Sequence, residues 1–191
     1  MNTKLFVFAE EQSAKIVLDT ILPKILPANV EFNVYSHQGK QDLEKAIRKT
    51  LPIFSKIPGA RIMIVRDQDS ADCVILKQHL TAIVAEYCNA PYLIRIVCRE
   101  LECWYLGDLK AIQSAYSRFN IKKHENKKDF RNVDVLQNAV ILLKSIIPEY
   151  SIHKHLPKIE CANKIAPLLD VEFNTSESFL QFVSGVKKLC N

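Results

Sequence analysis

The sequence predicts an α/β fold in which a four-stranded parallel sheet, flanked by helices, precedes a helical C-terminal extension. Short apolar runs alternate with helix-length amphipathic segments through residues 1–100, whereas residues 101–191 show only helical periodicity. A chain of 191 residues is long enough to bury a core without disulfides or a structural metal. We therefore expect an α/β domain at 1–100 with the extension, 101–191, packed on it.

Periodicity identifies each element of the first part. Residues 4–9 (KLFVFA) and 61–66 (RIMIVR) are compact apolar runs of strand length, and residues 30–36 (VEFNVYS) alternate in polarity. The segments between them repeat apolar residues every three or four positions, as a helix with one buried face does. The expected elements are strand 4–9, helix 11–26, strand 30–36, helix 41–57, strand 61–66, helix 70–88 and strand 92–98.

The second part reads as helices at 104–116, 133–147 and 176–189, separated by polar or proline-bearing stretches. We expect these helices to pack on the last edge or the mouth of the sheet. Trp104 and Tyr105 are expected to pack between the sheet and the extension rather than to stack on bases, because large aromatic side chains dominate cores and interfaces.

Composition excludes several classes of protein. Hydrophobic residues make up 48% and charged residues 25%, the balance of a globular chain. The longest apolar stretch, 139–147, is far shorter than the roughly 20 residues of a membrane span. Four scattered glycines form neither a G-x-G-x-x-G turn nor a Walker A loop, which argues against Rossmann dehydrogenases and P-loop ATPases. The first residues resemble no signal peptide, so we expect a cytoplasmic protein without membrane contact.

Acidic residues follow three of the predicted strands. Glu10 follows the first, Asp67 and Asp69 follow the third, and Glu100 and Glu102 follow the fourth. Ligands of open parallel sheets bind beyond the carboxyl ends of the strands, so Glu10 and the two aspartates converge if strands one and three are neighbours. Gathered carboxylates repel one another unless a cation holds them, and Mg²⁺ or Mn²⁺ is the simplest such cation. A bound divalent ion polarises phosphoryl groups and activates water.

Local structural roles are the alternative for the same residues. Glu10 and Glu11 are also explained as acids that favour the first turn of a helix, and Asp69 or Ser70 as the N-cap of the helix that follows. Glu100 is also explained by pairing with a neighbouring arginine. Each residue alone fits such a role, but three acidic strand ends together favour a metal site.

Residues 118–131 carry most of the net charge of +5, since six Lys and Arg stand against two acids in this segment. Such a run is either a solvated surface or a patch that contacts phosphate, because Lys and Arg neutralise nucleic-acid backbone irrespective of sequence. The candidate nucleic-acid contacts are Lys122, Lys123, Lys127, Lys128 and Arg131.

Several blocks along the chain resemble a bacterial family. The blocks are residues 9–13 (AEEQS), 37–43 (HQGKQDL), 66–73 (RDQDSADC), 98–108 (CRELECWYLGD), 165–167 (IAP) and the tail 174–182. They resemble domain-of-unknown-function family 4276, a Toprim-like family related to the overcoming-lysogenization-defect nucleases. A carboxylate after strand one and a D-x-D after strand three is the pattern of the Toprim domain itself, a Rossmann-like fold.

The resemblance implies roles for the acidic residues. Glu10 matches the Toprim glutamate and Asp67 and Asp69 match its D-x-D, so these three are expected to hold Mg²⁺ or Mn²⁺. Glu100 and Glu102 lie where a second ion or an orienting carboxylate is expected.

Two further positions bear on the activity. Lys158 lies where the family usually has a lysine and is expected to stabilise developing phosphate charge, with a plain surface lysine as the alternative. Most Toprim domains follow the glutamate with glycine, and this chain has Glu11 there, which is either a further ligand or a group that repels phosphodiesters.

The expected function is Mg²⁺- or Mn²⁺-dependent phosphodiester hydrolysis, a nuclease activity on DNA or RNA in a bacterial defence system. The alternative is a non-catalytic regulatory or effector-binding partner of a neighbouring ATPase. Glu11 favours the alternative, whereas the intact D-x-D and the basic run favour the nuclease.

Overall fold

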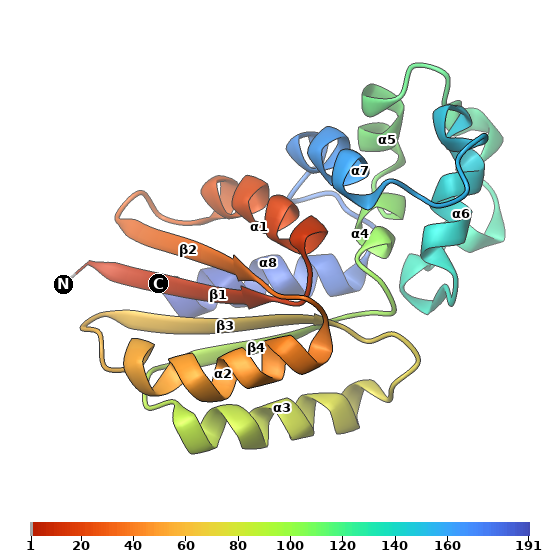
Figure 1. The fold of residues 1–191 in the computed structure, drawn as a ribbon. Helices are drawn as coiled ribbons and strands as arrows, with labels where there is room; N and C mark the ends of the chain where they lie inside the picture. Colours follow the sequence, from red (N-terminus) through yellow and green to blue (C-terminus); the bar gives the residue numbers. More distant parts are fainter. Residues whose placement is uncertain (1) are drawn as a thin grey trace.

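Four parallel strands form the central layer of the structure, a computed structural model that describes residues 2–191 (Figure 1). Their order across the sheet is β2-β1-β3-β4. The strands are β1 (Thr3–Ala9), β2 (Val30–Ser36), β3 (Ala60–Asp67) and β4 (Tyr92–Val97). The first and third strands are therefore neighbours, with Ala9 in register with Val65. The predicted α/β fold with a parallel four-stranded sheet is confirmed.

Helices cover both faces of the sheet (Figure 1). One face carries α2 (Lys40–Phe54) and α3 (Cys73–Tyr87), and the other carries α1 (Gln12–Ile25) and α8 (Glu177–Cys190). Because β2 and β3 lie on opposite sides of β1, right-handed crossovers place α1 and α2 on opposite faces.

Alternate residues of each inner strand enter two separate cores. In β1, Leu5 and Val7 belong to the core under α1, whereas Phe6 and Phe8 belong to the core under α2 and α3. A parallel strand that is buried on both faces reads as a continuous apolar run, which explains why the short runs in the sequence predict strands.

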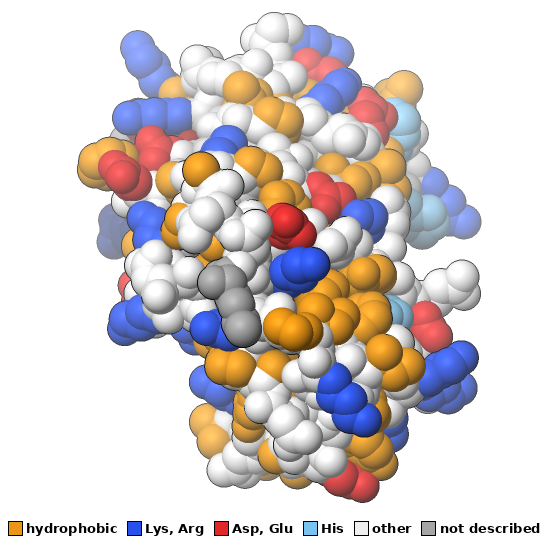
Figure 2. Space-filling view, turned by 90° about the vertical axis from the view of Figure 1, so that its left-hand side faces the viewer, with side chains coloured by type: hydrophobic (Ala, Val, Ile, Leu, Met, Phe, Trp, Pro, Cys, Tyr) orange, Lys and Arg blue, Asp and Glu red, His pale blue; other side chains and the backbone are white. Residues whose placement is uncertain are grey.

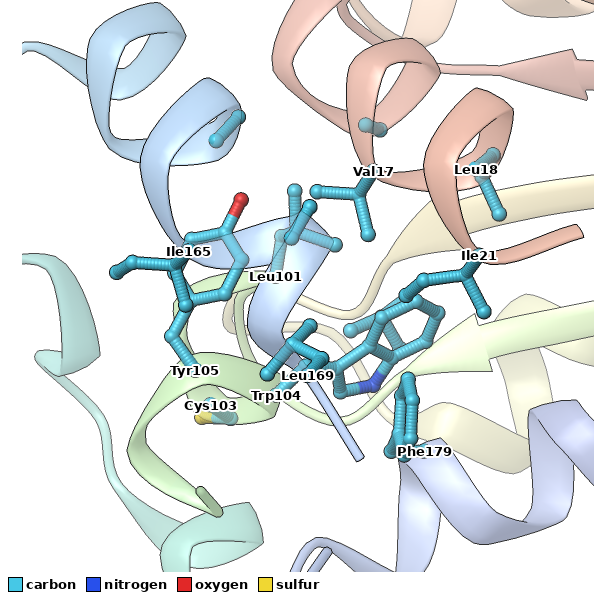
Figure 3. Packing of buried hydrophobic residues seen from close by; sticks show 14 of the residues in the cluster. Val17, Leu18, Ile21, Leu101, Cys103, Trp104, Tyr105, Ile165, Leu169 and Phe179 are labelled. Carbon is cyan, nitrogen blue, oxygen red and sulfur yellow. The ribbon is translucent and has the colours of Figure 1, made fainter. Parts of the chain in front are cut away.

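Most of the extension lies beyond the carboxyl ends of the strands, whereas its last helix, α8, covers one face of the sheet (Figure 1). The rest of the extension contains α4 (Glu102–Leu106), α5 (Leu109–Ala115), α6 (Ala139–Ile146) and α7 (Lys158–Ile165), joined by short 3-10 turns. Its core is continuous with the core under α1. Figure 3 shows Trp104 beside Ile21 and Phe179, and both Trp104 and Tyr105 are only 1% exposed, as expected of side chains that pack the extension onto the sheet.

The boundaries of the extension's helices differ from the sequence expectation. The single helix expected at 104–116 is two helices, because Asp108 interrupts it and its carboxylate accepts a hydrogen bond from the Ala111 N–H as the N-cap of α5. The helix expected at 133–147 begins only at Ala139. Helix α7 was not expected, since its eight residues contain too few apolar positions to show a period.

At the opposite end of the molecule, at the amino ends of the strands, the basic side chains of residues 2–191 are spread out rather than gathered (Figure 2). Figure 2 shows Lys and Arg side chains spread around this face and hydrophobic side chains near its middle. Within residues 2–191, no helix is both long enough and apolar enough to cross a membrane.

Candidate functional site

The acidic residues after the first and third strands lie at the edge of the sheet where the strand order reverses, and they belong to two groups of side chains. The chain leaves β1 toward β2 on one side, and β3 returns to the other side of β1. Asp67 is the last residue of β3, and Glu10 directly follows β1. Open α/β sheets bind ligands at the carboxyl ends of their parallel strands.

Glu10 lies beside an arginine and an aspartate. Its side chain is 18% exposed, and its Oε2 atom lies 3.7 Å from Nε of Arg66, whose Nη1 atom pairs with Glu44 at 2.8 Å. Burial and then the charge of Asp69 raise the pKa of Glu10, and the Arg66 charge opposes this shift. Asp69 itself is exposed and adopts a left-handed backbone with φ of 54°.

A second group of carboxylates surrounds Lys158. The Lys158 Nζ atom lies 3.1 Å from Oε1 of Glu11 and 3.5 Å from Oε1 of Glu102, whose side chain is only 1% exposed. The Leu101 N–H donates a hydrogen bond to Oδ2 of Asp67 at 3.3 Å. Asp67, at the end of β3, is thus hydrogen-bonded to the N-cap residue of α4, the helix that follows β4.

The pKa values of this group follow from burial and like charge. Burial, followed by the charges of Glu102 and Glu11, raises the pKa of Asp67 well above its usual range, and Lys158 opposes the shift. Burial also raises the pKa of Glu102, again against Lys158. The pKa of Lys158 is raised despite its burial, because the surrounding carboxylates stabilise the ammonium form.

The structure decides between the capping alternatives. Glu11 occupies the N-cap position of α1 but makes no side-chain cap; its carboxylate instead accepts a hydrogen bond from Ser13 Oγ and faces Lys158. The N-cap of α3 is Asp72, which accepts hydrogen bonds from two backbone N–H groups, so the expectation that Asp69 or Ser70 caps this helix is wrong. Neither the Glu11 nor the Asp69 side chain therefore caps a helix, and capping does not explain these two acids.

Tyr105 of α4 also lies beside the carboxylates around Lys158. The sequence predicts a packing role for this residue but not that its hydroxyl lies near the site. Tyr105 lies one helical turn after Glu102 in α4, and its buried hydroxyl has no hydrogen-bond partner among residues 2–191 (Figure 3). Burial, followed by the charge of Glu102, raises the pKa of Tyr105. The sequence did contain a signal for this position, because residues three apart in a helix, such as Glu102 and Tyr105, lie on the same face.

Other expected site residues lie apart from these carboxylates. The Glu100 carboxylate accepts a hydrogen bond from the Val140 N–H at 3.1 Å, at the start of α6. The candidate nucleic-acid contacts are exposed residues of the segment between α5 and α6, and they are Lys122, Lys123, Lys127, Lys128 and Arg131.

The oxygen atoms of the candidate ligands are of the chemical type that hard divalent cations prefer. All the candidate ligands are carboxylates, and the Oε2 atoms of Glu10 and Glu102 are buried with no hydrogen-bond partner in the described part of the chain. Across residues 2–191, no three Asp, Glu, His or Cys side chains converge as a ready metal-binding group. In this arrangement Arg66 pairs with Glu10, and Lys158 pairs with Glu11 and Glu102.

Comparisons with known proteins identify a family. A family model described as Domain of unknown function (DUF4276) matches residues 9–187. This range contains the sheet from the end of β1 onward and nearly all of the extension, including Glu10 and Lys158. The searches of curated proteins and of solved structures found no match.

Proposed function

We propose a function from two premises: the chain belongs to the DUF4276 family, and desolvated carboxylates gather at the switch point of its sheet. The proposed function is Mg²⁺- or Mn²⁺-dependent hydrolysis of phosphodiesters, by a Toprim-type nuclease that acts in bacterial defence. The observation that carries the proposal is that Glu10 and Asp67 follow neighbouring parallel strands and that each interacts with further carboxylates, Glu10 with Asp69 and Asp67 with Glu11 and Glu102.

In this proposal Glu10, Asp67 and Asp69 hold the metal, which when bound polarises the phosphoryl group and activates a water molecule. Lys158 donates hydrogen bonds to a non-bridging phosphate oxygen and so stabilises the charge that develops there. Glu11 and Glu102 aim the Lys158 ammonium, since it lies within 3.5 Å of both carboxylates. Tyr105 and the surrounding apolar side chains keep bulk water from the inner side of the site.

A second candidate function has its own observation. Arg66 and Lys158 already lie beside the carboxylates, so the cluster is partly neutralised by the chain itself. This arrangement favours a non-catalytic protein that regulates a neighbouring ATPase or binds an effector for it.

A nuclease assay separates the two functions. The purified protein is incubated with labelled single-stranded DNA, duplex DNA and RNA in Mn²⁺, Mg²⁺ or EDTA. We expect cleavage that requires a divalent cation and that falls about a hundredfold or more in Glu10→Gln, because a ligand of the metal is lost.

The matched control is Glu31→Gln, which changes an exposed glutamate of β2 far from the carboxyl ends of the strands. It is expected to cleave like the wild type. Equal cleavage by Glu10→Gln and the wild type, or no cleavage of any substrate in Mn²⁺, would reject the nuclease and leave the regulatory role.

A further inference from the structure

The extension contains a pocket that the proposed catalytic residues do not use. Its volume is about 420 Å³, within the range of small-molecule sites. It lies between α5 and two loop segments, residues 121–130 and 168–175, and it begins at Leu106. Leu106 ends the short helix that starts at Glu102, so the pocket begins about 6 Å along a helix axis from the acidic site.

Phe173 lines this pocket with most of its ring in solvent. The side chain is 79% exposed. The backbone that carries it is held in place, because the Asp170 carboxylate accepts hydrogen bonds from the N–H groups of Glu172 and Phe173. An exposed aromatic ring on a fixed loop is the kind of platform on which unpaired bases stack.

The basic segment, residues 118–131, supplies another wall of the pocket. Ile121, Glu125 and Phe130 line the pocket, and the neighbouring cationic side chains of the segment are exposed. None of the five candidate contacts named above forms an ion pair within the described residues. Their charges therefore remain available for phosphate groups.

Aromatic packing gives the basic segment a defined shape. The ring of His124 stacks on Phe119 with centroids 5.1 Å apart and meets the edge-on ring of Phe130 at 5.8 Å. Phe119 and Phe130 are buried. The cationic side chains are thus presented by a packed scaffold on one rim of the pocket.

The charged side chains of the pocket lining indicate which part of a nucleotide can enter the pocket. Asp108, Glu125 and Asp170 place three carboxylates in the lining against the single cation Lys110. A phosphate inside the pocket would be repelled, whereas an uncharged ring with N–H groups can donate hydrogen bonds to Glu125 and to Oδ2 of Asp170; Asp108 already accepts hydrogen bonds from two backbone N–H groups. Phosphates belong on the basic segment outside.

We propose that this pocket and the basic segment together bind single-stranded nucleic acid. One unstacked base enters the pocket against Phe173, and the flanking phosphates lie along the lysines. A base paired in a duplex cannot reach either the pocket or the ring, so the site selects single strands. The inference rests on the proposed nuclease function in that it names the class of substrate, but its test does not depend on catalysis.

The test measures the fluorescence anisotropy of a labelled 12-nucleotide single strand, as DNA and as RNA, and of the matching DNA duplex, all in EDTA. We expect the wild type to bind a single strand more tightly than the duplex. Phe173→Ala is expected to weaken single-strand binding about 5- to 100-fold, since one base stack is lost, and to leave duplex binding within about twofold.

Two further variants complete the test. Ile152→Ala removes an apolar side chain that is 90% exposed and lies outside the pocket lining, and it is expected to change nothing. The double variant Lys127→Glu/Lys128→Glu is expected to weaken binding to single strands and duplex alike and to lower the dependence of affinity on salt by about two ions.

Unchanged single-strand affinity in Phe173→Ala, tighter binding of the duplex, or no binding of nucleic acid at all would overturn the inference. Because the assay contains EDTA, these outcomes are independent of metal-dependent cleavage. A protein that binds single strands through Phe173 but cleaves nothing in Mn²⁺ would instead reject the proposed nuclease and keep this binding site.

Discussion

Asp67→Asn is expected to make the fold more stable in the absence of metal while it abolishes metal-dependent cleavage. Burial and the charges of Glu102 and Glu11 disfavour the Asp67 carboxylate and raise its pKa. Asparagine has no charge to desolvate, and its oxygen can still accept the hydrogen bond from the Leu101 N–H. The same substitution removes a ligand of the proposed metal, so activity is lost as stability rises.

The pH dependence of this effect has a definite sign. A carboxyl group whose pKa is raised on folding binds protons more tightly in the native state, so its favourable contribution is present below about pH 4, the unfolded pKa of Asp, and is lost as pH rises through the folded pKa. The stability difference between Asp67→Asn and the wild type should therefore grow with pH, to about 1 to 2 kcal/mol at pH 8.

Thermal unfolding in EDTA between pH 4 and pH 8 measures this difference, which corresponds to a rise in Tm of about 2 to 8 °C at pH 8. The control is Asp19→Asn, which alters an exposed carboxylate paired with Lys15 and is expected to change Tm by little at any pH. A variant Asp67→Asn that is less stable than the wild type at pH 8 would show that the carboxylate is a stabilising element of the apo fold.

Lys158→Met is expected to destabilise the protein at pH 8 by about 2 kcal/mol. The change leaves the buried Glu102 carboxylate without its ion-pair partner. Breaking a fully buried pair costs about 3 to 5 kcal/mol; the smaller value is expected here because a third of the Lys158 side chain reaches solvent. At pH 5 the loss should be smaller, since the raised pKa of Glu102 lets it take up a proton.

A second substitution separates this effect from simple loss of packing. Glu102→Gln in the Lys158→Met background is expected to recover most of the lost stability at pH 8, because the most buried carboxylate that Lys158 pairs with is then uncharged, whereas Glu11 reaches solvent. Lys164→Met is the matched control on the same helix, and its pair with Glu160 is half-exposed, so a loss below about 0.5 kcal/mol is expected. Equal destabilisation by both lysine variants would contradict a special role for Lys158.

The sheet was predictable from the sequence because its inner strands β1 and β3 are buried on both faces and its edge strand β2 alternates in polarity. Runs such as 61–66 are continuous and apolar, and the amphipathic helices between them leave a parallel sheet as the natural arrangement. The extension was less predictable, since its helices are short. Single capping side chains such as Asp108 set the ends of these helices, and the helices are too short to show a repeated spacing of apolar residues.

The acids of the candidate site were predictable from their place at strand ends, which parallel topology brings to one edge. Arg66 was also visible in principle, as a charged residue directly after the apolar, buried run 62–65. The approach of Lys158 to Glu11 was not, because 147 positions separate the two residues and α7 has no clear sequence signal. Only the family resemblance pointed to Lys158.

We propose that the carboxylates at the sheet edge bind a divalent cation, and thermal unfolding during a titration with Mn²⁺ or Mg²⁺ measures this binding without any nucleic acid. At about 100 times the dissociation constant, binding stabilises the wild type by roughly 2.7 kcal/mol, a rise in Tm of about 5 to 10 °C. We expect this rise in the wild type and no rise in Asp67→Asn/Asp69→Asn. No rise in the wild type, or an equal rise in both proteins, would contradict the proposal.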